Sequence, residues 1–287
     1  MAITVGSNIS SLKAQRTLAL STDALSRTFE RLSSGQRINR ASDDAAGLAI
    51  ADNLRAQSRV ATVAVRNAND GISTIAIADS ALGEIGNVLS RLAELAEQSA
   101  NGVFSIQQRS ALSNEFVALG SEIERIANVT EFNGVKLLSG GNALVLQVGF
   151  NSGSLSQISY NGVQGTLQAL GLATAGSSVL TYSITGTDIA EGQSSSRLAL
   201  DAINNAISSL ASTRGTLGAT ESRLQVAINS ITVARENFLA AESRIRDVDV
   251  AGEAAELTRL GILQQAGSAV LAQANQQPSL ALSLIGR

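Results

Sequence analysis

The strongest indication of the fold is the stretch of residues 203–245, INNAISSLASTRGTLGATESRLQVAINSITVARENFLAAESRI. It carries an apolar side chain at every seventh position. Charged side chains, among them Arg214 and Glu221, lie between these positions. A narrow apolar seam with charged flanks is typical of helices that pack as in a coiled coil. The sequence therefore predicts one long helix over 196–246. Its seam residues are Ile203, Leu210, Leu217, Leu224, Ile231, Phe238 and Ile245.

A second long helix is predicted over 43–99, where Ile75, Leu82 and Leu89 repeat the same spacing. At ~1.5 Å per residue this helix spans ~85 Å, and the helix over 196–246 spans ~75 Å. Because the lengths match, we expect the two helices to pair antiparallel and bury both seams. A shorter helix over 105–129 is expected to lie alongside them.

Amphipathic helices are also predicted at both ends of the chain. The first covers 4–35, and the last lies within 250–285. Antiparallel rods would leave both segments protruding from the same end. Without a partner they bury too little apolar surface to offset the entropy of ordering, so we expect them to be frayed in the free molecule. The apolar residues expected to pack them are Leu18, Leu25, Phe29, Leu32, Leu257, Leu260, Leu263, Val270 and Leu271.

The middle of the chain has a different composition. From about 132 to 193, Gly, Ser and Thr are frequent and no helical period is present. The runs ALVLQVG (143–149) and LSQISY (155–160) flank a turn at 151–153, which predicts a β-hairpin over 143–160. The expected fold is therefore mainly α. It is an elongated antiparallel helical rod, made of a coiled-coil-like three-helix bundle and a β-hairpin, with paired N- and C-terminal helices.

The adjacent carboxylates Asp43 and Asp44 invite two interpretations, a metal or catalytic site and a helix start. Ser42 precedes them and an Ala-rich helix follows. Ser is a preferred N-cap, and each acidic residue near the first turn contributes ~0.3–1 kcal/mol through the helix dipole. A divalent metal needs more oxygen ligands than this pair supplies. We therefore interpret Ser42, Asp43 and Asp44 as helix-start residues.

Composition excludes several functions. The 287 residues contain no His and no Cys, so the commonest general base, the thiol nucleophile and the usual zinc ligands are absent. We expect no catalytic residue, no metal site, no cofactor and no enzymatic activity. The net charge of −3 without a basic stripe argues against nucleic acid. No apolar run predicts membrane insertion, and the N-terminus lacks a cleaved signal, so export would use another route.

Long motifs at both ends of the sequence resemble bacterial flagellin. In chain order they are LSSGQRINRASDDAAGLAIADNLRAQ (32–57), RNANDGISTIAIADSAL (66–82), LAELAEQSANG (92–102) and TEFNGVKLLSG (130–140). The segment 243–287, which ends in ANQQPSLALSLIGR, looks like the flagellin C-terminus to its last residue. The resemblance covers roughly 1–160 and 195–287.

The resemblance implies a division into domains. An inner, filament-core domain would combine 1–42 with 251–287, and a rod domain would cover 43–250. In many flagellins the middle of the chain forms large outer domains. Here only the Gly/Ser-rich surface segment 161–194 is left in their place, so a short form with a thin, smooth filament is expected.

The resemblance also implies the function. The chain would be the structural subunit of the flagellar filament, outside the cell, serving swimming motility. It would be exported unfolded by a type III route and polymerise at the distal tip through its terminal helices. Heterologous contacts between copies do not close and therefore extend into filaments. An export chaperone is expected on the C-terminal helix, about 250–285, together with filament cap and hook-junction proteins.

One further partner follows from the resemblance alone. In flagellins that animals sense, a Toll-like receptor contacts motifs that match RLAELAEQ (91–98). The matching residues are Arg91, Leu95 and Glu115.

Two alternatives stay open at the level of sequence. A hook–filament junction or minor flagellar accessory protein can share the terminal architecture, and a secreted coiled-coil effector is a more distant reading. A metalloprotease insert, which some flagellins carry, requires an H-E-x-x-H helix and is excluded by the lack of His.

Overall fold

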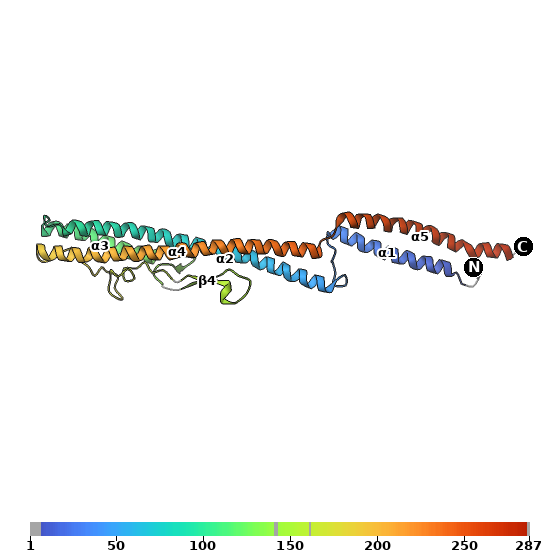
Figure 1. Cartoon of the computed structure of the whole chain (residues 1–287), viewed down its shortest axis with the longest axis horizontal. Helices are drawn as coiled ribbons and strands as arrows, with labels where there is room; N and C mark the ends of the chain where they lie inside the picture. The colour runs from blue at the N-terminus through green and yellow to red at the C-terminus, as the bar shows by residue number, and fades with distance from the viewer. Residues whose placement is uncertain (1–6, 141–142, 161, 286–287) are drawn as a thin grey trace. The chain divides into compact units, whose positions relative to one another are not determined.

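A computed structural model describes residues 7–140, 143–160 and 162–285, with side chains up to residue 279. The ends of the predicted inner domain, 1–6 and 286–287, and residue 161 lie outside the described residues. The helices are α1 (Ile9–Ser34), α2 (Ala45–Ala100), α3 (Ile106–Val129), α4 (Ile189–Arg246) and α5 (Val250–Ile285). The mainly α fold with long paired helices and small β-hairpins is confirmed (Figure 1).

The described residues fall into two compact units. One, here called the terminal unit, contains the described parts of 1–58 and 236–287, and the other, the central unit, is 59–235. Their boundaries lie inside α2 and α4 rather than at 42/43 and 250/251. The division into an inner and a rod domain is a functional one and stays a prediction.

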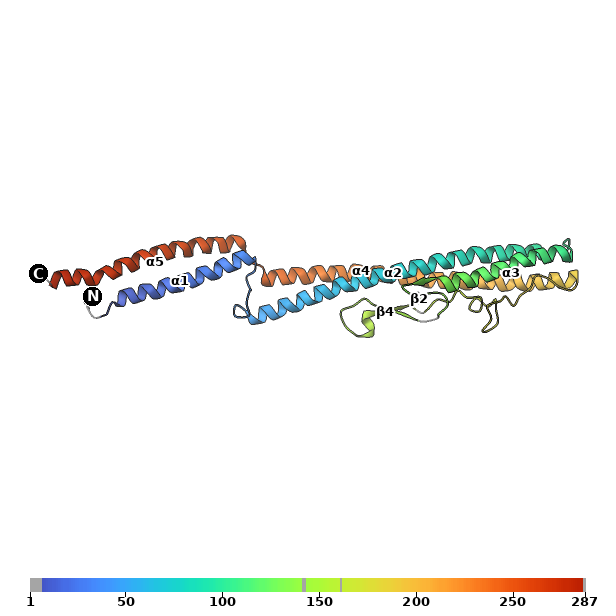
Figure 2. The same cartoon turned by 180° about the vertical axis from the view of Figure 1, so that it is seen from behind.

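The central unit is built around α2, α3 and α4, which run side by side in both views (Figures 1 and 2). Its core joins Leu82 and Leu89 of α2, Phe116 of α3 and Leu217 of α4, all 1% exposed or less. Full burial of each such side chain contributes ~1.5–3 kcal/mol. An ion pair between Asp79 and Arg214 ties α2 to α4 across this core.

The helix α4 begins earlier than the sequence predicts, at Ile189 rather than 196. The Asp188 carboxylate accepts a hydrogen bond from Glu191 N at 2.7 Å and so caps the helix. Within the Ser-rich first turns of α4, the Ser196 hydroxyl is satisfied inside the helix, where it donates to Gly192 O at 2.7 Å. Ser196 is fully buried.

Two antiparallel hairpins follow α3. The hairpin of β3 (Leu144–Gln147) and β4 (Gln157–Tyr160) lies within the predicted range 143–160, with the short 3-10 helix η1 (Ser154–Ser156) in its connection. A second, unpredicted hairpin joins β1 (Glu131–Phe132) to β2 (Val135–Lys136). Its turn residues Asn133 and Gly134 have φ of 49° and 78°, as the Asn-Gly signal for a tight hairpin requires.

The segment expected at the surface, 161–194, contributes to the core of the central unit. Its buried side chains are Val163, Leu167, Leu170, Leu172 and Ile184. Hydrogen bonds anchor it at both ends: Leu167 N donates to Glu124 Oε2 at 3.1 Å, and the buried Ser99 hydroxyl donates to Ile184 O at 2.7 Å. These residues carry no regular period, so sequence reasoning gave them no place in the core.

Among the described helices, α2 alone is long and apolar enough to cross a membrane by length and composition. The sequence predicts no membrane span. Ala- and Leu-rich positions of α2, such as Ala78, Leu82 and Leu89, are fully buried in the central unit. Packing in that core accounts for the composition of this helix.

In the terminal unit, α1 and α5 pair antiparallel (Figures 1 and 2). Contacts run from Arg31–Glu253, at 3.6 Å, through Gln264–Thr22, at 3.3 Å, to Asn8–Ala274 at the other end. Gly35, with a φ of 70°, ends α1 in the left-handed conformation that glycine adopts readily. Two backbone hydrogen bonds join the segment after α1 to the connection between α4 and α5. Arg37 N donates to Arg246 O, and Val248 N donates to Gly35 O.

Candidate functional site

The paired carboxylates at the start of α2 bind backbone N–H groups. Asp44 caps the helix, with Oδ1 accepting from Gly47 N at 2.9 Å. Asp43 closes the preceding turn, with Oδ2 accepting from Asn39 N and Arg40 N at 3.2 and 3.0 Å. These two bonds, the one from Arg40 foremost, lower the pKa of the Asp43 carboxyl. The predicted N-cap role of Ser42 is therefore wrong, because the turn places Asp44 directly before the first helical residue.

The same arrangement starts α5, where Asp249 Oδ1 accepts from Ala251 N and Gly252 N at 3.1 and 3.3 Å. Across residues 7–140, 143–160 and 162–285, no group of three or more Asp, Glu, His or Cys side chains is arranged to hold a metal ion. The carboxylates at both helix starts act on the backbone.

The predicted seam residues lie mainly in one core. Ile203, Leu210, Leu217, Leu224 and Ile231 of α4 are at most 5% exposed, and Ile75, Leu82 and Leu89 of α2 at most 1%. Phe238 and Ile245 are only half-buried. They lie in the terminal unit, where 236–246 faces 45–58 through ion pairs such as Arg246–Asp52 and α3 contributes no third helix.

Several large apolar side chains of α1 and α5 stay exposed although the two helices pack on each other. Leu260 is buried at 4% exposure, whereas Leu18, Leu25, Leu32, Leu257 and Leu271 are half-buried. The predicted packing residues Phe29, Leu263 and Val270 are 65%, 43% and 59% exposed. Among the side chains described on these helices, further exposed apolar residues that the sequence did not single out are Ile9, Leu12, Leu20, Val250 and Ile262. Their signal is that apolar side chains occur on more than one face.

The three residues proposed to meet a receptor lie in different environments. Arg91 on α2 binds Glu115 on α3 at 2.9 Å and Glu94 at 2.8 Å, and all three side chains are at least 45% exposed. The hydrogen bonds to Glu94 and then Glu115 raise the pKa of Arg91. Leu95 is fully buried in the core of the central unit. The outer surface here is therefore an ion-pair cluster, with Leu95 beneath it.

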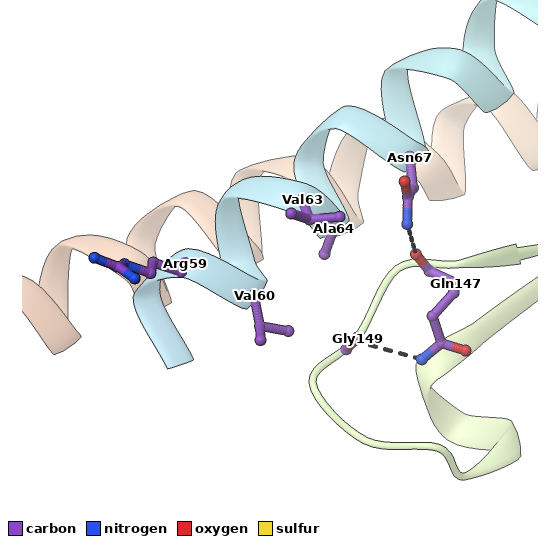
Figure 3. Close-up of a pocket in the computed structure, with 7 residues that line it drawn as sticks. All are labelled: Arg59, Val60, Val63, Ala64, Asn67, Gln147 and Gly149. Atoms are coloured by element: carbon purple, nitrogen blue, oxygen red, sulfur yellow. Dashed lines mark hydrogen bonds between the residues drawn. The ribbon is translucent and has the colours of Figure 1, made fainter. Parts of the chain in front are cut away.

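A hollow of about 300 Å³ lies between α2 and the end of β3 (Figure 3). Val60, Val63 and Ala64 line its helical side, and Asn67 Nδ2 donates to Gln147 O at 3.1 Å. Arg59 carries the one charge in the lining, and Figure 3 shows its side chain directed away from Gly149. The lining offers no nucleophile beside a base and no pair of acidic groups, which hydrolytic or transfer chemistry would need.

Comparison with known proteins decides the family. The profile of the bacterial flagellin N-terminal helical region matches residues 5–143, and that of the C-terminal helical region matches 200–285. Flagellin from Halalkalibacterium halodurans is 44% identical over 282 residues, which cover 98% of this chain and 99% of that relative. The chain belongs to the bacterial flagellin family.

Two further relatives place this flagellin among proteins of similar length. Flagellin from Bacillus subtilis is 40% identical over 98% of this chain and 99% of its own. The flagellar filament 33 kDa core protein of Treponema phagedenis is 39% identical with the same coverage.

Membership in the flagellin family establishes the general function of the protein. This flagellin is a structural, non-enzymatic subunit of the extracellular flagellar filament, which serves motility, and it polymerises with copies of itself. The two family profiles match the chain's two ends. The segment between them, 144–199, contains the hairpin of β3 and β4 and most of the irregular segment that packs on the core of the central unit.

Proposed function

We propose that α1 and α5 make the subunit-to-subunit contacts of the filament core, in an inner domain of 1–42 and 251–287. The observation that carries this proposal is the exposed apolar surface on these helices, represented by Leu12, Phe29, Ile262 and Val270. Apolar side chains exposed over two adjacent helices are typical of an interaction surface. Burial of each in a neighbouring subunit would contribute up to ~1.5–3 kcal/mol.

The same exposed surface is consistent with assembly of exported chains at the distal tip of the filament. Two helices that bury few side chains on each other are marginally stable, so they remain loosely ordered until a neighbour covers them. Export as an unfolded chain then does not require a stable pair of terminal helices to be unfolded. The chain has no Cys and a single Pro, so no disulfide has to form at the tip and proline isomerisation concerns one bond only.

Deletion of 261–287 tests this assignment, because it removes most of α5 and leaves the central unit intact. Purified variant and full-length flagellin are mixed with short filament fragments, and growth is followed by electron microscopy. We expect growth from the full chain and none from the variant, with the helical circular dichroism of α2, α3 and α4 retained. Filament growth by the variant would refute the assignment.

The same experiment separates the filament subunit from the alternative of a junction or minor accessory protein. A filament subunit extends the fragments over many micrometres from its own pool. An accessory protein adds a limited number of copies and then stops.

We further propose that the export chaperone binds α5 along the face that carries Ile262 and Val270. An amphipathic helix laid into an apolar groove is a common recognition mode, and both side chains are about 60% exposed. Cap and hook-junction proteins would meet the same terminal helices at the ends of the filament. Chaperone binding measured by calorimetry should be lost when Ile262 and Val270 are both changed to Ser.

We propose that contact with a Toll-like receptor, where a host senses this flagellin, runs through Arg91 and Glu115. Both are exposed, whereas Leu95 is buried and supports the helix beneath them. Arg91→Ala should lower the response of receptor-expressing cells. Arg125→Ala, which breaks an exposed pair with Glu122 on α3, is the matched control.

A further inference from the structure

The helix α5 contains a proline near its end, at position 278. Proline has no backbone N–H, so it cannot donate the hydrogen bond that the carbonyl four residues earlier would accept. That carbonyl belongs to Ala274, a residue only 6% exposed. A carbonyl oxygen that is shielded from water and has no donor lowers the stability of the fold. The hydrogen-bond series of α5 therefore lacks one donor, at Ala274 O.

Asn8, the residue before α1, fills this opening. Its Nδ2 donates to Ala274 O at 2.7 Å. Its Oδ1 accepts from Ser11 N at 3.0 Å and so caps α1. One amide side chain therefore satisfies two backbone groups that helix geometry leaves unpaired, one on each helix.

A second polar contact lies one helical turn along α1. The Ser11 hydroxyl, on a residue 5% exposed, donates to Asn275 Oδ1 at 2.7 Å. Farther along the pair, the polar contacts are Gln264 to Thr22, at 3.3 Å, and Arg31 to Glu253, at 3.6 Å. Thr22 is exposed and the Arg31 side chain is 34% exposed, so water weakens these two contacts, although the Glu253 side chain is only 16% exposed. The two polar contacts that involve the buried residues Ala274 and Ser11 thus lie near the proline.

We propose that Asn8 sets the register of α1 on α5 by binding the one carbonyl that Pro278 leaves open. A slide by one turn, ~5.4 Å, would aim the amide at a carbonyl already used within the helix and leave Ala274 O unpaired. The exposed apolar side chains of both helices are thereby held at a fixed offset. This inference rests on the proposed function of α1 and α5 as the filament contacts, because a defined offset is what repeated contacts between copies require.

A cycle of two substitutions tests the coupling. Asn8→Ser keeps a good N-cap but loses the amide that reaches Ala274 O. Pro278→Ala restores an N–H that can donate to the same carbonyl from within α5. The full-length chain and its three variants are grown from filament fragments, and the critical concentration for growth is measured for each.

We expect Asn8→Ser alone to raise the critical concentration about tenfold, the factor that corresponds to ~1.4 kcal/mol. In the Pro278→Ala background the same substitution should change it less than about twofold, since the carbonyl is then satisfied without Asn8. Pro278→Ala alone should grow like the natural chain. Thr22→Val is the matched control, because it removes an exposed contact of the same helix pair and should leave growth unchanged.

An equal effect of Asn8→Ser in both backgrounds, or no effect in either, would overturn the register role. Failure of Pro278→Ala to grow would do the same. These outcomes are distinct from failure of the proposed function, which shows as continued growth after deletion of 261–287.

Discussion

At the scale of single residues, ion pairs and buried side chains contribute very differently to this flagellin. Arg214 binds both carboxylate oxygens of Asp79, at 2.7 and 2.9 Å, and holds α2 to α4. Both side chains are about 40–46% exposed, so water screens their attraction. Leu224, by contrast, is fully buried in the seam. Packing therefore dominates the central unit, and the surface pairs adjust it.

Asp79→Asn should lower the free energy of unfolding at pH 7 by about 0.5 kcal/mol. The hydrogen bond from Arg214 lowers the pKa of Asp79 in the folded state. The contribution is therefore fully present above the unfolded pKa of about 4 and is lost as the pH falls through the folded-state value. Urea unfolding at pH 7 and at pH 3 checks this: the difference between variant and natural chain should be smaller at the lower pH. A difference that grows in acid would contradict the assignment.

Leu224→Asp should lower the free energy of unfolding by more than about 4 kcal/mol, because it buries an unpaired charge in the α2–α4 core. Thermal melting followed by circular dichroism measures the change. Val226→Asp, two residues along the same helix, is the control, since Val226 is 68% exposed and should tolerate a charge. Equal melting of the two variants would show that the seam runs elsewhere.

At the scale of elements, the long helices depend on side chains that end or begin them. Asp44, Asp188 and Asp249 accept backbone N–H groups at the starts of α2, α4 and α5. At the other end of α2, the buried Arg109 donates to the carbonyls of Ser99 and Asn101. This guanidinium pairs carbonyls that the end of a helix leaves open, so it replaces water in the turn between α2 and α3.

Asp44→Ala should destabilise the start of α2 by about 1 kcal/mol, the usual effect of removing an N-cap. Ser42→Ala is the matched control two residues earlier, and it should change stability by less than about 0.5 kcal/mol. Chemical denaturation of both variants measures the two values. A larger loss of stability for Ser42→Ala than for Asp44→Ala would show that Ser42 is the N-cap of α2.

At the scale of the whole molecule, the two units differ in how much they bury. The central unit joins three helices, two hairpins and the segment after β4 around one core. The terminal unit pairs α1 with α5 and leaves side chains such as Leu12 and Phe29 exposed. Local stability follows the density of buried apolar contacts, so the two units should open at different free energies.

Hydrogen exchange in dilute, unpolymerised protein should show this difference. Amides of α1 and α5 are expected to exchange quickly, whereas those of α2 around Leu82 and Leu89 stay protected, because only the latter lie in a closed core. In filaments, the amides of α1 and α5 should become protected as neighbours cover them. Strong protection of both helices in the dilute monomer would contradict the proposed assembly.

Most helices and the main hairpin of this flagellin are encoded by local patterns of residues. These local signals are the period of seven in α4, the carboxylates before helix starts, Gly35 after α1 and the turn near 151–153. Each one acts on the backbone within a few residues, so it can be recognised without knowledge of the fold. The Asn-Gly pair at 133–134 is an equally local signal, and it marks the turn between β1 and β2. Family motifs near both ends carried the function, because they span several of these elements in order.

Which irregular or polar residues are buried depends on the packing of distant segments. Leu167 and Leu172 are buried although no period marks them, Arg109 is buried although it is charged, and Leu95 is buried although its motif suggested a surface role. Asn8 meets Ala274 from a position 266 residues away in the chain. Burial of this kind depends on which segments meet in space, and a local pattern holds no information about a partner so distant in sequence.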